Sequence, residues 1–174
     1  MALRILYHGT DAESAKAICD GIDLNVGSNR SDFGKGFYTT DDFYRASKWA
    51  RHTAYAVKGK PAVVKMYFDE EAAKPLIRYL EDDLNWGRFI INNRNGREYI
   101  DKVTYKDNNL DAKYEITVGR IADLNVLDVV DELRKSGKML DSIGEMLNPK
   151  YPLQIVFHTE RAISYIKKIS YQNI

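Results

Sequence analysis

The residues of this chain best suited to chemistry lie in two short motifs near its start. The first, His8 to Thr10, follows an apolar stretch, so its histidine and glycine lie where a strand stops and exposed chemistry can begin. The second, Asp32 to Thr40, places two glycines before an aromatic pair. The backbone can therefore pass close to a ligand that one of the rings covers. Together the motifs predict a pocket for a nicotinamide nucleotide.

The second motif contains Phe33-Gly34-Lys35-Gly36-Phe37-Tyr38, which resembles the Phe-Gly-Lys-Gly-aliphatic-Tyr element of the ADP-ribosyltransferase superfamily. The resemblance is to the poly(ADP-ribose) polymerase and diphtheria-toxin-like branch, which also has a strand-terminal His-Gly-Ser/Thr. Over nearly its whole length, the chain resembles more closely a bacterial family of ADP-ribosyltransferase-like domains. That family's pattern is matched by Tyr7-His8-Gly9, Asp32 to Thr40, Trp49-Ala50 and Gln154 to Glu160.

The resemblance implies residues that bind NAD as a co-substrate. His8 would hydrogen-bond a ribose hydroxyl, the Gly9 backbone would contact the nicotinamide amide, and Tyr38 would stack on the nicotinamide ring. Trp49 follows Tyr38 by eleven residues, about three helical turns, and takes the position of the family's second stacking aromatic. The predicted residues are His8, Tyr38 and Gln154 for catalysis, and Gly9, Thr10, Arg30, Phe33, Gly36 and Trp49 for NAD binding.

Several of these residues also fit an ordinary structural role. Thr10 and Glu13 have the spacing of a capping box, so Thr10 is as well suited to capping a helix as to binding a ligand. Tyr38 and Trp49 would otherwise be core aromatics. Arg30 either pairs with a pyrophosphate or is a solvated loop charge. The histidines and carboxylates show no metal-like spacing, and no metal is predicted.

Gln154 departs from the pattern of the best-known enzymes that the chain resembles. Those enzymes carry a glutamate there, which contacts the ribose and helps to polarise the acceptor. Glutamine can hydrogen-bond a ribose hydroxyl but has no charge and cannot act as a base, which favours a single transfer over chain elongation. Glu160 and Glu115 are the candidates for an assisting carboxylate. Glu160 also suits the first turn of a helix, and Glu115 suits the polar face of a strand.

Length and composition indicate one domain, residues 1–174, with one sizeable core. Lys and Arg number 26 against 25 Asp and Glu, so the net charge of +1 gives no broad field for nucleic acid. A local basic groove, involving Arg88, Arg94 and Arg97, stays open as an alternative to solvated loop charges. One cysteine excludes an internal disulfide framework. Without a standard signal peptide or a membrane-length apolar run, the chain is expected to be cytoplasmic with no membrane partner.

The elements that must position the motifs are short helices among scattered strands, which predicts an α+β domain. Helices are expected at 10–20, 41–57, 124–147 (two helices) and 159–166, and strands at 62–68, 114–118, 153–157 and 169–171. Asn92 to Gly96 is expected to be a turn, and 69–113 a family-specific insertion. The resemblance implies an ADP-ribosyltransferase-like fold, in which two small antiparallel sheets pack face to face around an NAD cleft.

These observations predict an NAD-dependent mono-ADP-ribosyltransferase that releases nicotinamide and modifies a protein or nucleic-acid acceptor. By the resemblance, bacterial relatives of this size often act as toxins or effectors, and a small antitoxin-like protein is an expected partner. Two alternatives use the same pocket. In an NAD glycohydrolase, water replaces the acceptor. In a module that binds NAD or ADP-ribose without turnover, Gln154 would be the signature of lost catalysis.

Overall fold

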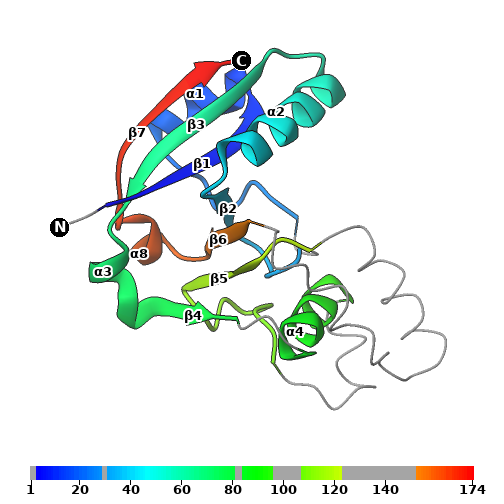
Figure 1. The fold of residues 1–174 in the computed structure, drawn as a ribbon, viewed down its shortest axis with the longest axis vertical. Coiled ribbons are helices and arrows are strands. Elements are labelled where there is room, and N and C mark those ends of the chain that lie inside the picture. Colours follow the sequence, from blue (N-terminus) through cyan, green and yellow to red (C-terminus); the bar gives the residue numbers. More distant parts are fainter. Residues whose placement is uncertain (1–2, 29–30, 81–83, 96–106, 123–151) are drawn as a thin grey trace.

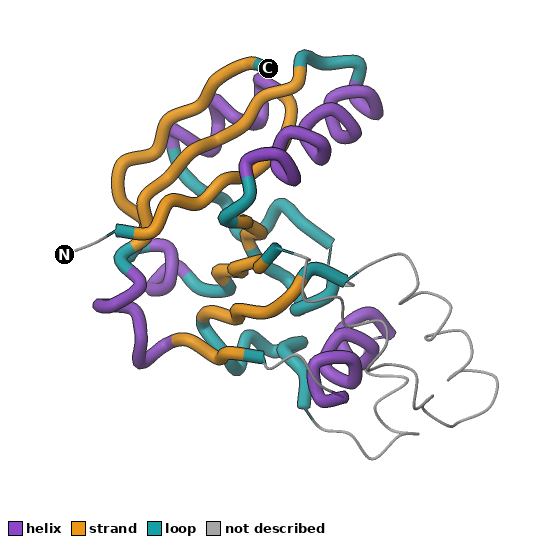
Figure 2. The backbone as a smooth tube through the Cα atoms, in the orientation of Figure 1, coloured by secondary structure: helices purple, strands orange, loops and turns teal. Residues whose placement is uncertain are grey.

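The computed structural model describes residues 3–28, 31–80, 84–95, 107–122 and 152–174 (Figures 1 and 2). The strands are β1 (Arg4–Asp11), β2 (Phe37–Thr40), β3 (Pro61–Phe68), β4 (Ile77–Tyr79), β5 (Ile116–Arg120), β6 (Leu153–Phe157) and β7 (Ile166–Asn173). The helices are α1 (Ala12–Asp20), α2 (Phe43–Val57), α3 (Glu70–Ala73), the 3₁₀ turn η1 (Lys74–Leu76), α4 (Leu84–Asn95) and α8 (Glu160–Ile163). The prediction of an α+β domain is confirmed.

The described strands form one seven-stranded sheet in the order β4-β5-β6-β2-β1-β3-β7. β4 runs parallel to β5, and the other neighbouring pairs are antiparallel. The expectation of two separate antiparallel sheets is therefore corrected. The link between the two halves of the sheet is narrow, because β1 pairs with β2 only through Tyr7 and Thr40, whereas it pairs with β3 along its full length.

The sheet bends strongly at this link. Figure 1 shows β1, β3 and β7 in one half, β4, β5 and β6 in the other, and β2 between them. A flat sheet would separate β3 from β6 by three strand spacings, about 14 Å. Instead, the ring centroids of Phe68 on β3 and Phe157 on β6 lie 5.1 Å apart. The two halves therefore share one apolar core, because the bend brings their inner faces together. This core includes Leu6, Met66, Ile116 and Ile155.

α1 and α2 cover opposite faces of β1 and β3. Alternation along β1 turns Leu6 toward α1 and turns Tyr7 and Gly9 toward α2. α2 begins after Asp42, whose carboxylate accepts a hydrogen bond from the Arg45 amide. Its buried side consists of small residues, so its backbone can lie very close to β1. These small residues are Ala46, Ser47, Ala50 and Ala54.

α4 covers the outer face of β5 and β6, and it includes most of the predicted asparagine-rich turn. Asn92 and Asn93 are buried within the helix, so the turn prediction is wrong. Asn92 Nδ2 donates to the Asp107 carbonyl at 2.9 Å, and Asn93 Oδ1 accepts from the Asn109 amide at 2.8 Å. These tertiary hydrogen bonds outweigh the local preference of asparagine for turns. Described residues of the region 69–113, such as Ala73, Phe89 and Ile90, thus belong to the apolar core, and a family-specific insertion there stays a prediction.

Other element predictions are largely confirmed, with shifted boundaries. The helix expected at 41–57 and the strands expected at 62–68 and 153–157 are present. The last helix ends at Ile163 rather than Ile166, and the closing strand starts at Ile166. The two helices expected at 124–147 lie outside the described residues.

Candidate functional site

His8 lies beside the narrow link, and its imidazole contacts β2. Nδ1 is 2.7 Å from the Tyr38 carbonyl oxygen, and the ring centroid is 4.8 Å from that of Phe37. A carbonyl can only accept, so Nδ1 carries a proton and the Nε2 of a neutral ring is an acceptor. Burial lowers the pKa of His8, against the smaller effect of the carbonyl hydrogen bond, so the ring is neutral near pH 7. No described residue hydrogen-bonds Nε2.

Tyr38 uses its hydroxyl to hold together the second motif, Asp32 to Thr40, which we call the glycine motif. The hydroxyl donates to the Gly34 carbonyl at 2.7 Å and accepts from the Phe33 amide at 2.9 Å. Burial, and then the negative charge of Asp32, raise the pKa of Tyr38, so the phenol stays protonated. The ring of Phe33 is fully buried, with its centroid 6.0 Å from that of Phe89. Phe33, which the sequence predicts as an NAD contact, therefore supports the motif from inside the core and does not present its ring at the surface.

Gln154 belongs to a polar group with Asp32 and Arg94. Its register pairs it with Thr40 on β2 and Gly119 on β5. The Gln154 Nε2 is 3.5 Å from Asp32 Oδ2, at the long limit of a hydrogen bond. Asp32 Oδ1 accepts from Arg94 Nε at 2.6 Å, and the two side chains form a partly buried ion pair. α4 thus anchors the start of the glycine motif through Arg94. This arginine, which the sequence places in a candidate basic groove, is paired with Asp32 instead.

The predicted assisting glutamates do not join this polar group. Glu115 accepts hydrogen bonds from the Thr159 hydroxyl at 2.8 Å and from Arg161 at 3.0 Å. Glu160 is exposed in the first turn of α8. The carboxylate that does lie beside Gln154 is Asp32, which sequence reasoning missed. In the sequence, 122 residues separate Asp32 from Gln154, so no local pattern links the two. The one signal for Asp32 is its place at the start of the glycine motif.

Two glycines predicted to bind NAD are required by the packing of the chain. A Cβ on Gly9 would lie 1.9 Å from the Ala46 carbonyl oxygen of α2. A Cβ on Gly36 would lie 2.7 Å from the Phe157 carbonyl oxygen and 2.8 Å from His158 Nδ1. Neither position can accept a side chain without displacing its neighbours. The fold alone is therefore sufficient reason for a glycine at both positions.

Thr10 is buried on β1 and does not cap the following helix. Its hydroxyl is 3.5 Å from Asp11 Oδ2. The cap is Asp11, whose Oδ1 accepts from the backbone amides of Glu13 and Ser14 at 3.0 Å each. The capping-box interpretation is wrong by one residue, because β1 continues through Asp11.

Trp49 lies on the exposed side of α2. Its ring is 61% exposed and stacks on His52 with centroids 5.4 Å apart. Predicted NAD contact Arg30 lies outside the described residues, as does groove candidate Arg97. The structure thus brings His8 to the Tyr38 backbone and Gln154 to Asp32, while Trp49 lies in a separate environment.

The three predicted catalytic side chains do not converge on one hydrogen-bond network in the described part of the chain. Tyr7, Thr40 and Gln154 form a row across β1, β2 and β6, so they share a face of the sheet. His8 follows Tyr7 and points to the opposite face by strand alternation. Tyr38 connects the two sides of the sheet. Its carbonyl accepts from His8, and its side chain packs against an apolar cluster that includes Phe89 and Ile90 of α4.

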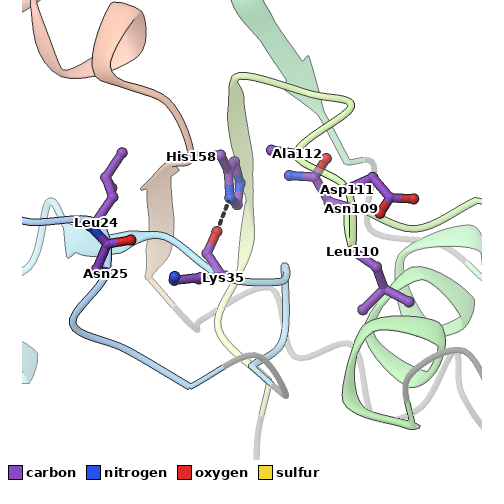
Figure 3. A pocket seen from close by; sticks show the side chains of 8 residues that line it. All are labelled: Leu24, Asn25, Lys35, Asn109, Leu110, Asp111, Ala112 and His158. Atoms are coloured by element: carbon purple, nitrogen blue, oxygen red, sulfur yellow. Dashed lines mark hydrogen bonds between the residues drawn. The ribbon is translucent and has the colours of Figure 1, made fainter.

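His158 is a buried histidine with both ring nitrogens bonded. Nδ1 donates to the Lys35 carbonyl at 2.7 Å, so Nε2 accepts from the Thr117 hydroxyl at 2.8 Å. Burial lowers the pKa of His158 to about 4. Figure 3 shows the ring and Lys35 at the wall of a cavity of about 230 Å³, between the loop at Leu24 and the segment 109–112. The eight predicted site residues that the structure describes do not line this cavity.

A family described as "Protein of unknown function (DUF3990)" matches residues 4–168. The chain belongs to this family. The DUF3990 match runs from the start of β1 into β7, so it includes both motifs and Gln154. No curated protein matches the chain.

The part of the chain that the structure describes also bears on two other kinds of site. No helix there is long and apolar enough to cross a membrane. No three His, Cys, Asp or Glu side chains in these segments come together in a group that could hold a metal ion.

Proposed function

We propose that this DUF3990 protein is an NAD-dependent mono-ADP-ribosyltransferase. The observation that carries the proposal is the hydrogen bond between the two motifs, from His8 Nδ1 to the Tyr38 carbonyl at 2.7 Å. The hydrogen bond places the proton on Nδ1, and burial lowers the pKa so that the ring is neutral. Nε2 is then an acceptor with no hydrogen-bond partner among the described residues. A half-buried acceptor of this kind fits a ribose hydroxyl, which would supply a donor.

The reaction breaks the bond between the nicotinamide nitrogen and ribose C1′. The bonding electrons go to the nitrogen, nicotinamide leaves as a neutral molecule, and the ribose becomes oxocarbenium-like. An acceptor group then bonds to C1′ and loses a proton. His8 would orient the ribose. By strand alternation, Gln154 and the adjacent Asp32 lie on the other side of the sheet from His8. The Asp32 carboxylate would therefore favour the cationic sugar through its charge and not by direct contact.

The uncharged Gln154 supports a single transfer rather than the growth of a polymer. A glutamine holds a hydroxyl but does not remove its proton, so each acceptor would have to be nucleophilic already. We include in this proposal a protein or nucleic-acid acceptor, a toxin or effector role, a small antitoxin-like partner and a cytoplasmic location. The acceptor, the toxin or effector role and the partner follow from the resemblance of the motifs to ADP-ribosyltransferases. The cytoplasmic location follows from the single cysteine and from the lack of a membrane-length apolar run in the sequence.

The test is nicotinamide release from NAD by the purified protein, with and without cell lysate. The proposal expects release that needs lysate and falls at least tenfold in His8→Ala and Gln154→Ala. Gln172→Ala is the matched control, because Gln172 is exposed on the edge strand β7. Release without lysate would favour the glycohydrolase, and NAD binding without release would favour the binding module.

A second pair of variants tests the role of Asp32. Asp32→Asn and Arg94→Met both remove the same ion pair, but only Asp32→Asn removes the carboxylate. If the charge assists the reaction, Asp32→Asn loses nicotinamide release while Arg94→Met keeps it. Equal loss in both variants would assign Asp32 to holding the glycine motif and would contradict a role in the reaction.

A further inference from the structure

The outer side of α2 combines exposed aromatic rings with unpaired cations. Tyr44 is 73% exposed and Tyr55 is 87% exposed. Lys48 and Arg51 are also exposed, and neither has a hydrogen bond or ion pair with any residue that the structure describes. These four residues, spaced at intervals of three and four, form one stripe along the helix, which we call the α2 stripe. Figure 1 shows α2 on the outside of its half of the sheet.

The charge of this segment differs from that of the chain as a whole. The chain is nearly neutral, with a net charge of +1, but residues 43–60 contain no Asp or Glu. Their cations are Arg45, Lys48, Arg51, Lys58 and Lys60. A segment with several cations and no anion is complementary to a polyanion, and the exposed rings at the two ends of the α2 stripe provide faces on which bases can stack.

We propose that the α2 stripe binds single-stranded nucleic acid. Tyr44 and Tyr55 are eleven residues apart, which is about 16 Å along the helix axis, the rise of four to five stacked nucleotides at 3.4 Å each. A base could stack on each tyrosine while the phosphates between them lie over Lys48 and Arg51. Bases in a duplex are not available for stacking, so the exposed rings favour a single strand over a duplex.

The position of α2 connects this surface to the proposed reaction. The buried side of the helix lies against Gly9, the residue that follows His8, through the backbone of Ala46 and Ala50. A single nucleic-acid strand bound to the outer side of α2 would therefore be held by the helix that packs against the first motif, His8 to Thr10. Naming this strand as the ADP-ribose acceptor rests on the proposed function, whereas binding itself does not.

The test measures fluorescence anisotropy of a labelled, mixed-sequence 12-nucleotide single strand, as DNA and as RNA, with the full chain at 50 and 150 mM salt. We expect binding to at least one strand that is at least tenfold tighter than to the duplex of the same length. Tyr44→Ala with Tyr55→Ala weakens binding by about tenfold or more. Lys48→Glu with Arg51→Glu does the same and makes the slope of log affinity against log salt shallower by about 1.4, since two phosphate contacts are lost.

Matched controls separate the stripe from total charge and from general effects of losing a tyrosine. Lys16→Glu with Lys74→Glu changes the net charge equally but lies on α1 and η1, and both lysines are exposed. Tyr79→Ala removes a ring that is 49% exposed on β4. Both controls are expected to change affinity less than twofold. Each variant must also keep the wild-type thermal unfolding midpoint within about 3 °C.

Three results would overturn the proposal: no binding of either strand at 50 mM salt, equal weakening by the control variants, or duplex binding as tight as single-strand binding. If the wild-type protein releases nicotinamide but binds neither single strand, the transferase proposal stands with a protein as the acceptor, and the α2 stripe is not a nucleic-acid-binding surface. If the wild-type protein binds a single strand but releases no nicotinamide, nucleic-acid binding by the α2 stripe is supported and the proposed transferase activity is contradicted.

Discussion

The two halves of the sheet are stabilised in different ways. In the half with β1, β3 and β7, small and apolar side chains allow close backbone packing, and Gly9 lies directly under α2. In the half with β4, β5 and β6, buried asparagines and the ion pair of Asp32 with Arg94 hold α4 to the glycine motif. Apolar packing follows from local sequence patterns, whereas a polar network depends on partners far apart in the chain.

The largest expected effect tests the close packing in the first half. Gly9→Ala places a Cβ 1.9 Å from the Ala46 carbonyl oxygen, so α2 must move away from β1. We expect a loss of more than about 3 kcal/mol in the free energy of unfolding, at or beyond the upper end for overpacking. Denaturant unfolding measures this loss. The control is Gly21→Ala, where no heavy atom lies within 4 Å of the added Cβ, and a large loss in both variants would contradict the explanation.

The second prediction tests the polar network of the other half. Asn93→Ala removes side-chain hydrogen bonds to the Phe89 and Asp32 carbonyls and from the Asn109 amide. It leaves buried groups without partners, so we expect a loss of about 3 kcal/mol in unfolding free energy. Asn25→Ala, in an exposed loop, should cost less than about 0.5 kcal/mol. Similar losses in the two variants would show that the network does not stabilise this half.

The third prediction concerns pH. The folded-state pKa of His158, about 4, is below its unfolded value, so the unfolded chain binds more protons between about pH 6.5 and 4. Stability is therefore full above pH 6.5 and falls as the pH decreases, by about 2 kcal/mol at pH 5. The lowered pKa of His8 acts in the same direction.

Urea unfolding at pH 7.5 and pH 5.0 measures this loss. His158→Gln should lower stability at pH 7.5 but reduce its dependence on pH, because one proton-binding group is removed. His52→Ala, which changes an exposed ring, should keep the wild-type dependence. An unchanged pH dependence in His158→Gln would contradict the assignment to this residue.

The smallest effect compares a partly buried ion pair with an exposed one. Arg94→Met leaves Asp32 without its charged partner, in a site where the side chains are 22% and 14% exposed. We expect a loss of about 1 to 2 kcal/mol in unfolding free energy. Arg78→Met breaks a pair with Asp107 whose side chains are 44% and 39% exposed, and should cost below about 1 kcal/mol. A larger loss in Arg78→Met would reverse the ranking by burial.

The sequence predicted elements most reliably where a local pattern determines them. The helical period of 41–57 and the apolar stretches at 62–68 and 153–157 each correspond to an element in the structure. Asn92 and Asn93 were assigned to a turn because local preference cannot reveal buried partners on other segments. The helix cap is Asp11 and not the predicted Thr10, because pairing with β3 continues β1 through Asp11.

For the candidate site, the sequence identified the two motifs, and the structure joins them through His8 and Tyr38. Roles in NAD chemistry for His8, Tyr38 and Gln154 stay predictions. The buried ring of Phe33 and the exposed ring of Trp49 show why residue type alone does not locate a contact. Aromatic side chains suit a core, a ligand or a surface equally well, and only their neighbours distinguish these environments.

By itself, the sequence determined the α+β class, the positions of the main helices and strands, and the residue types available near β1 and β2. Hydrophobic periodicity and glycine placement determine these features over a few residues of chain. Only the tertiary structure decided that one bent sheet replaces two, that Asp32 lies beside Gln154, and that α4 anchors the glycine motif. These contacts join residues that are tens of positions apart, and their energy depends on burial, which exists only once the chain has folded.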